Sequence, residues 1–380
     1  MAKFNKEITS TEEYVDINGI PQYLLHLEGT KENPVLLFLH GGPGSAESIF
    51  AHLMQENWDK HYTVVHWDQR GAGKTLTKNS SNTTIPTLEL LLEDLSHVVT
   101  YLKKKYNKDK IAILGHSWGS VLGTLFIKKY PNEVSHYIGV GQVINMMENE
   151  RVGYEKVKEE IIKSNNNSDL KKLESLGEYP TQQFDKTTIK SISKIRKLQS
   201  KYKLAVSPNL SLILGVFRSP IFKLSDISSM AKGLDVNFGI LKYLFENYDL
   251  NKESLEYKVP IYYILGDNDW QTPYNMAQAY FEKIIAPKKE LFMIHNAGHI
   301  TMLDNPTDFY KALCKCSPIS WYKKEWIVKK STLLLIILFI FLSLLLLFTF
   351  VSFFNTLWKI HILNYLSSII KKLLLHNSFN

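Results

Sequence analysis

The chain has 380 residues, of which 45% are hydrophobic and 12% aromatic, and a formal net charge of +8. This length allows a full core with an insertion and exceeds what one minimal domain needs. Most of the positive charge lies in residues 315–380, where eight lysines stand against one glutamate, so the rest of the chain carries a net charge of only +1. A nearly neutral body gives no support to a nucleic-acid partner, and none is expected.

Residues 1–141 are predicted to form the N-terminal part of an α/β core. Residues 13–28 hold two alternating strands joined by a hairpin turn at Asn18-Gly19. Strands then alternate with helices as far as about Gly141, which predicts a mostly parallel sheet with helices on both faces.

A glycine-rich loop, His40-Gly41-Gly42-Pro43-Gly44, follows the buried-type strand at 34–39. Glycines at the end of a strand leave backbone N–H groups open to a ligand, as an oxyanion hole requires, and the N–H of Gly42 is the first candidate donor. The alternative interpretation is an ordinary Gly/Pro turn.

A second loop, Asp68-Gln69-Arg70-Gly71-Ala72-Gly73-Lys74, follows the predicted strand at 63–67. We expect Asp68 and Arg70 to form an ion pair that orders this loop. Its glycines are expected to permit the turn.

The segment Gly115-His116-Ser117-Trp118-Gly119 is predicted to be a nucleophile elbow, a sharp turn that presents a serine between a strand and a helix. The apolar strand 110–114 precedes it and a helix running to Pro131 follows it, as the G-x-S-x-G pattern requires. Ser117 is therefore the candidate nucleophile, and the N–H of Trp118 is the second candidate oxyanion donor.

Residues 142–257 are predicted to form a helical cap, because long Lys/Glu-rich helical stretches replace the strand–helix alternation here. An aminopeptidase would need acids in this cap to hold a free ammonium group, whereas an esterase would need an apolar pocket. The acidic candidates are Glu148, Glu150 and Glu178. The apolar candidates are Met146, Met147 and Phe217. Spacing does not decide between them.

Residues 258–316 are predicted to complete the core and to supply the other two catalytic residues. The strand 259–265 ends just before Asp267 and Asp269, where a carboxylate would orient a catalytic histidine. Asp269 is preferred because the pattern G-x-x-D-x-x-x-P fits it, with Pro273 opening the next helix. Asp267 is then a turn residue.

His299 follows the last predicted strand, on a loop at its carboxyl end. The chain order Ser117, Asp269, His299 is the order expected of a hydrolase in which a serine is presented on an elbow. Other histidines, His40 and His116 among them, are expected to pack or hydrogen-bond near the site.

These segments resemble the α/β-hydrolase superfamily over roughly residues 13–313, and within it the proline iminopeptidases, which are serine aminopeptidases. The matches are His40-Gly41-Gly42-Pro43-Gly44, the Asp68–Lys74 loop, which is the most specific, and Ser117-Trp118-Gly119-Ser120. The departures from the family pattern are His116, Thr75 and the segment 266–269. They leave the catalytic residues intact and bear on the choice of substrate.

The resemblance implies an α/β-hydrolase fold with a helical cap and an acyl transfer to water that uses no metal or organic cofactor. Ser117 would attack a carbonyl, His299 would take and return the proton, and Asp269 would fix the imidazole. The substrate would be a small peptide or an ester. The oligomeric state stays open.

The tail is predicted to anchor the chain in a lipid bilayer through a C-terminal transmembrane helix. Residues 331–354 contain no charge, Pro or Gly, and as a helix they would span ~36 Å, enough for a bilayer core of ~30 Å. The alternative, a buried core helix, is disfavoured because this run is apolar on every face. Residues 355–380 are expected to form a short amphipathic tail.

Charge and cysteine content predict the compartment. Five lysines precede the span and three follow it, which favours a single-pass protein with its catalytic domain on the cytoplasmic side. The first residues lack the apolar stretch of a signal peptide. Cys314 and Cys316 are too few and too close for a disulfide framework, which agrees with a reducing compartment.

The leading hypothesis is a serine hydrolase of the proline-iminopeptidase type that releases N-terminal residues, proline preferred, from peptides. The alternative within enzymes is a membrane-associated esterase or lipase. An alternative of another class is a membrane-anchored binding protein on an inactive hydrolase scaffold, against which the intact Ser117, Asp269 and His299 argue.

Overall fold

The computed structural model describes residues 10–318, except 83, 182 and 206–209, together with a few residues between 337 and 367. Residues up to 319 form one compact unit and the later residues another, and each is treated by itself. Among the described residues, no helix is long and apolar enough to cross a membrane. The predicted span at 331–354 and the tail that follows it lie almost entirely outside the described residues.

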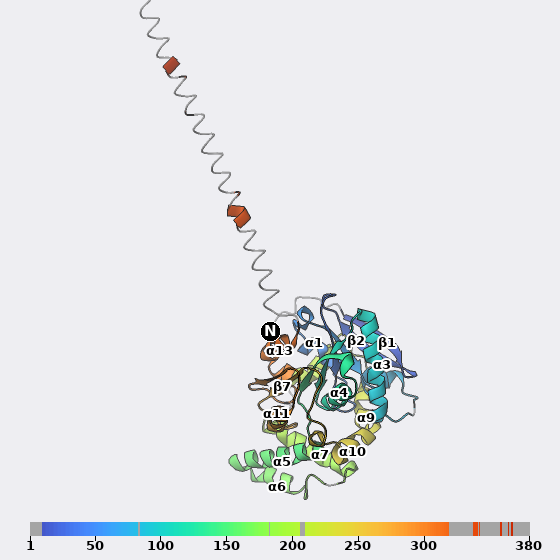
Figure 1. Cartoon of the computed structure of the whole chain (residues 1–380). Coiled ribbons are helices and arrows are strands. Elements are labelled where there is room, and N and C mark those ends of the chain that lie inside the picture. The colour runs from blue at the N-terminus through green and yellow to red at the C-terminus, as the bar shows by residue number, and fades with distance from the viewer. Residues whose placement is uncertain are drawn as a thin grey trace, which may run out of the picture. The chain divides into compact units, whose positions relative to one another are not determined.

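An eight-stranded sheet runs through the first unit (Figure 1). Its strands are β1 (Ser10–Ile17), β2 (Ile20–Leu27), β3 (Val35–Leu39), β4 (Thr63–Asp68), β5 (Ile111–His116), β6 (Val134–Val140), β7 (Ile261–Gly266) and β8 (Lys289–Ile294). Their order across the sheet is β1-β2-β4-β3-β5-β6-β7-β8. The pairs β1–β2 and β2–β4 are antiparallel, and every later pair is parallel. The predicted mostly parallel sheet is confirmed.

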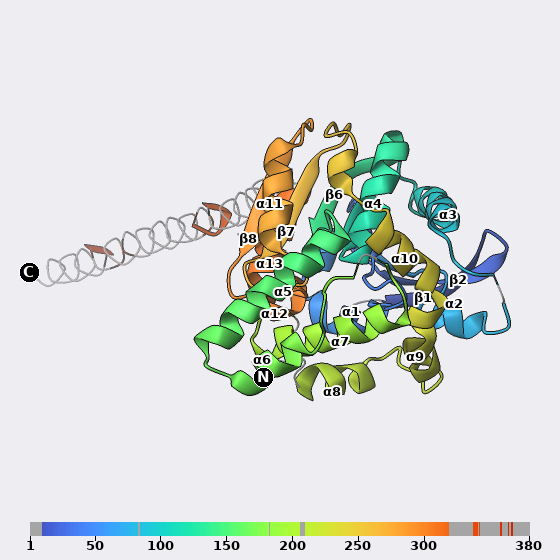
Figure 2. The same cartoon turned by 90° about the horizontal axis from the view of Figure 1, so that it is seen from below.

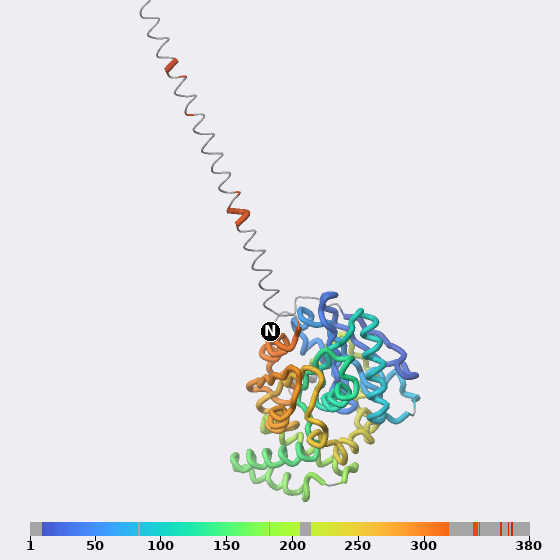
Figure 3. The backbone as a smooth tube through the Cα atoms, in the orientation of Figure 1, coloured from blue at the N-terminus to red at the C-terminus, as the bar shows by residue number. Residues whose placement is uncertain are grey.

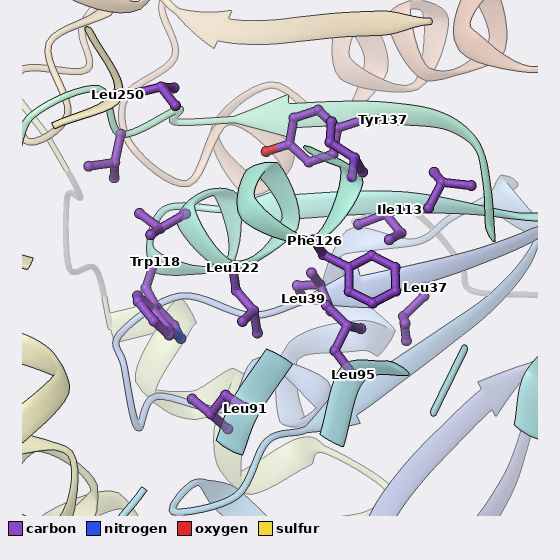
Figure 4. Packing of buried hydrophobic residues seen from close by; sticks show 14 of the residues in the cluster. Leu37, Leu39, Leu91, Leu95, Ile113, Trp118, Leu122, Phe126, Tyr137 and Leu250 are labelled. Atoms are coloured by element: carbon purple, nitrogen blue, oxygen red, sulfur yellow. The ribbon is translucent and has the colours of Figure 1, made fainter. Parts of the chain in front are cut away.

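The central strands are apolar throughout because helices cover both faces of the sheet. Leu37 and Leu39 of β3 point into one core, and Leu36 and Phe38 point into the other, as the alternation along a strand requires. The first core contains residues of α3 (Leu88–Tyr106), α4 (Trp118–Lys129) and α11 (Tyr274–Lys283). The second contains residues of α1 (Ala51–Met54), α12 (Thr301–Asp304) and α13 (Pro306–Cys316). Figure 4 shows side chains of α3 and α4 packed together against β3 and β5.

A group of helices between β6 and β7 forms the cap that the sequence predicted (Figure 2). The helices are α5 (Met146–Lys163), α6 (Asn167–Glu174), α7 (Lys186–Lys201), α8 (Leu210–Arg218), α9 (Asp226–Val236) and α10 (Phe238–Glu246). The cap has an apolar cluster of its own, built from α5, α6 and α7 around Val157, Leu173 and Ile195. In the tube view the cap helices, green to yellow, gather on one side of the unit (Figure 3).

Buried contacts fasten α9 to the core. Lys74 of α2 (Gly73–Lys78) bonds Asp226 at 2.8 Å, and both side chains are nearly fully buried. The amide of Asn237 donates to the carbonyl of Gly71 at 2.9 Å. A Cβ at Gly233 would lie only 2.2 Å from the carbonyl oxygen of Gly44, so the backbones of cap and core touch there.

We therefore expect Gly233→Ala to destabilise the protein by roughly 1–3 kcal/mol, because the new methyl group meets backbone that cannot move aside. Gly239→Ala is the matched control, since nothing lies within 4 Å of the Cβ position there. Urea unfolding of both variants measures the effect. Equal midpoints for the two variants would contradict the close backbone packing.

Candidate active site

The elbow holds Ser117 in a backbone conformation that few residues adopt. Its φ is 52° and its ψ is −119°, between the end of β5 and the first turn of α4. A Cβ at Gly119 would lie 2.0 Å from the carbonyl oxygen of Leu39, and one at Gly115 would lie 2.5 Å from the carbonyl oxygen of Gly119. The two glycines are therefore required by close backbone approach, and the strained turn leaves Ser117 partly exposed.

The structure brings Asp269 and His299 together. Nδ1 of His299 lies 2.9 Å from Oδ2 of Asp269, and both side chains are almost fully buried. The hydroxyl of Thr272 donates to the same oxygen at 2.8 Å, while the N–H groups of Gln271 and Thr272 donate to Oδ1 at 3.0 Å. Burial alone would raise the pKa of Asp269, but His299 and the donors of Thr272 lower the pKa below its ordinary value. The carboxylate is thus held ionised beside the imidazole.

Asp267 has a different partner. Its Oδ2 lies 2.9 Å from Nδ1 of His295, whose side chain is 78% exposed. The structure therefore pairs Asp269, and not Asp267, with His299, as the sequence pattern predicted.

The glycine-rich loop lies against the elbow. A Cβ at Gly41 would be 3.3 Å from Cβ of Ser117, and Gly42 adopts a φ of +114°. Within the described part of the chain the N–H of Gly42 has no hydrogen-bond acceptor. The N–H of Trp118 is at the first position of α4, where a helix offers no acceptor of its own. Both predicted oxyanion donors are thus available next to Ser117.

Gln69 ties these two loops together. Its side-chain oxygen accepts from Nε1 of Trp118 at 2.9 Å, and its backbone N–H donates to Nε2 of His40 at 3.1 Å. This residue belongs to the most family-specific of the matched segments, and its contacts give that segment a structural role beside the site.

The described residues include no hydrogen bond between the hydroxyl of Ser117 and His299. The imidazole of His299 instead lies against Gly141, where a Cβ would be 3.2 Å from Cε1 and Nδ1 of the ring. Gly141, with a φ of +53°, thus makes room for His299 next to the elbow.

The three cap glutamates have different surroundings. Glu148 is paired with Arg151 on the surface of α5. Glu150 is fully buried and is bonded by Arg196 and by the hydroxyl of Tyr179. Since Arg196 already neutralises Glu150, this carboxylate is not free for a substrate ammonium group. Glu178 lies exposed on a bend of the cap.

The predicted ion pair between Asp68 and Arg70 is wrong. Arg70 makes a bidentate pair with Asp94 of α3, at 2.7 and 2.9 Å. Asp68 accepts from the N–H of Lys74 at 2.8 Å instead, and burial raises the pKa of Asp68 to about 6. The loop is ordered by both contacts, but through partners that its own sequence does not contain.

Two residues beside the site were not anticipated. Thr272 bridges Asp269 and His299, and Glu47 binds His116. Only the role of Thr272 could have been predicted from local sequence, because a hydroxyl three residues after an acid in a turn can donate a hydrogen bond to that acid. Among the described residues, no group of three or more His, Cys, Asp or Glu side chains is arranged to hold a metal ion.

Comparison with known proteins agrees with this geometry. The model of the family described as alpha/beta hydrolase fold matches residues 34–306. The chain belongs to this family and is a hydrolase. The match includes the glycine-rich loop, the elbow, Asp269 and His299.

Among its relatives, the chain is 26% identical over 309 residues to a protein of Bacillus subtilis (strain 168) named probable aminopeptidase YbaC, covering 81% of this chain and 93% of the relative. It is 30% identical over 128 residues to the proline iminopeptidase of Heyndrickxia coagulans, covering 34% of this chain and 42% of that enzyme.

Among solved structures, the proline iminopeptidase of Mycobacterium smegmatis superposes with a TM-score of 0.57 at 18% identity, covering 80% of this chain and 96% of that one. A membrane phospholipase A described as a bacterial virulence factor superposes with a TM-score of 0.56 at 16% identity, covering 80% and 84%. At these identities the likeness shows the fold alone.

The contacts of the two acids predict unequal effects on turnover. Asp269→Asn should lower kcat by about 10⁴-fold, because an amide that donates to Nδ1 stabilises the wrong imidazole tautomer. Asp267→Asn should change kcat less than about threefold, because its partner His295 is at the surface. Steady-state measurement of kcat for both variants tests this. A larger loss of kcat in Asp267→Asn than in Asp269→Asn would assign the orienting role to Asp267.

Proposed function

We propose that this hydrolase is a serine aminopeptidase of the proline-iminopeptidase type, acting through Ser117, His299 and Asp269. The single observation that carries the proposal is the buried contact of His299 with Asp269. The imidazole of His299 lies against Gly141, beside the elbow. Similarity to the probable aminopeptidase of Bacillus subtilis over most of both chains supports the choice of substrate.

In the proposed reaction the Ser117 oxygen attacks the carbonyl of the N-terminal residue while Nε2 of His299 takes its proton. The N–H groups of Gly42 and Trp118 stabilise the oxyanion, each donor contributing ~3 kcal/mol to the barrier reduction. His299 returns the proton to the leaving amine, and the acyl enzyme forms. Water then attacks the acyl enzyme while His299 takes a proton from it. His299 returns this proton to the Ser117 oxygen as the bond to the acyl group breaks and the free N-terminal amino acid leaves.

A cavity of about 280 Å³ adjoins this centre and has room for a small substrate. Gly44, next to the oxyanion loop, and Ile300, next to His299, line it together with Met230 of the cap. Four charged side chains also line it, Glu47, Asp68, Lys74 and Asp226. Two of them are paired with each other, since Lys74 bonds Asp226.

A second candidate, an esterase acting on membrane lipids, is favoured by the surface of the cap. Large apolar side chains there are 38–78% exposed, and all lie within or beside α8 and α9. They are Leu214, Phe217, Leu224, Ile227, Met230 and Leu234. An exposed apolar patch of this kind is typical of a surface that meets lipid or another protein.

A substrate panel separates these functions. Prolyl arylamide should be hydrolysed with a kcat/KM at least about tenfold above that of other aminoacyl arylamides and of long-chain p-nitrophenyl esters, and Ser117→Ala should abolish all turnover with folding retained. A preference for the long-chain esters would favour the lipid esterase. A folded wild-type protein inert on the whole panel would favour the binding protein on an inactive scaffold.

We also propose that the apolar run at 331–354 anchors the enzyme in a membrane with the catalytic unit on the cytoplasmic side. Deleting residues 318–380 should release an enzyme with unchanged turnover on small substrates, because α13 and every strand of the sheet precede the cut. Carbonate extraction of membranes from cells that express each form measures this. Full-length protein in the soluble fraction would contradict the anchor.

A further inference from the structure

His116, the residue before the proposed nucleophile, makes two hydrogen bonds that use both nitrogens of its ring. Nδ1 lies 2.6 Å from Oε1 of Glu47, and Nε2 lies 2.9 Å from the backbone carbonyl oxygen of His299. A carbonyl oxygen only accepts, so Nε2 carries a hydrogen and donates. The His116 side chain is 2% exposed, and that of Glu47 is 13% exposed.

These contacts join three loops that the proposed reaction brings together. Glu47 follows the oxyanion loop, His116 ends β5 at the elbow, and His299 lies on the loop after β8. The rings of His116 and His299 are 5.0 Å apart. Movement of the His299 loop would therefore break a buried hydrogen bond to the elbow.

The surroundings of His116 favour its charged form. Burial alone would lower the pKa of His116, but the charge and the hydrogen bond of Glu47, with the carbonyl of His299, raise it above its ordinary value. Burial alone would raise the pKa of Glu47, but His116 lowers it. The other titratable groups that interact with this pair include His40, His66, His299 and Asp269. Asp304 also interacts with His299. An imidazolium paired with a carboxylate is the state that both directions favour.

We propose that His116, paired with Glu47, is a positioning residue for His299, an inference that rests on the proposed triad. It holds the backbone of His299 so that Nδ1 stays on Asp269 and the other ring nitrogen is left for Ser117. The chain thus has a second acid–imidazole pair behind the one that does the chemistry.

Two variants test this. His116→Gln removes the hydrogen bond to the backbone carbonyl of His299, and Glu47→Gln removes the carboxylate that holds the His116 ring. Both should lower kcat by about 10- to 100-fold with little change in KM, because His299 is less well held.

The double variant His116→Gln/Glu47→Gln leaves no unpaired buried charge and serves if His116→Gln fails to fold. Its loss in kcat should be close to that of either single variant, since the pair acts as a unit. The matched control is His295→Gln, which breaks the contact of His295 with Asp267 on the surface and should change neither kcat nor KM.

Folded Glu47→Gln and double variants with wild-type kcat would overturn the positioning role. The proposed triad would still stand, provided that Ser117→Ala and Asp269→Asn are inactive. A lower melting temperature with unchanged kcat would overturn it as well, since it would show a purely structural pair. Turnover retained by Ser117→Ala would overturn the proposed function, and the role of His116 with it.

Discussion

The active centre depends on one backbone contact, in which the first turn of α4 packs on the end of β3 with no side chain between them. Gly119 lies so close to the carbonyl oxygen of Leu39 that a Cβ at this position would be only 2.0 Å from it. Since β5 must turn sharply to reach this packing, Ser117 takes a strained conformation, and the glycine-rich loop after β3 comes to lie beside it. Nucleophile and oxyanion donors are thus positioned by the same close approach of two backbones.

Buried hydrogen bonds and ion pairs extend this constraint outward. Gln69 links the oxyanion loop to Trp118, and Arg70 fixes the same segment to α3 through Asp94. Lys74 then reaches Asp226 and holds the cap over the loop. Charged side chains are costly to bury unless they are paired, so each pair fixes the register of the elements it joins. The cap and the core therefore meet with the reactive loops between them.

Much of the core was predictable from local sequence. The apolar run at 34–39 became β3 at Val35–Leu39, because a strand buried on both faces has a pattern of its own. Asp269 was predictable from a strand end before it and from Pro273 after it, and in the structure β7 ends at Gly266 and Pro273 caps α11.

Partners distant in the chain were not predictable. Asp94 lies 24 residues from Arg70, and Glu47 lies 69 residues from His116, so only the folded loops bring them together. The same holds for Glu150, which is an acidic candidate in the sequence and which the fold buries against Arg196.

The proposed chemistry requires Ser117 to be the reactive nucleophile. Labelling with a fluorophosphonate followed by peptide mass spectrometry tests this most directly. We expect one adduct, on Ser117 and not on nearby Ser120. A folded protein without an adduct, or with the adduct on another serine, would contradict it.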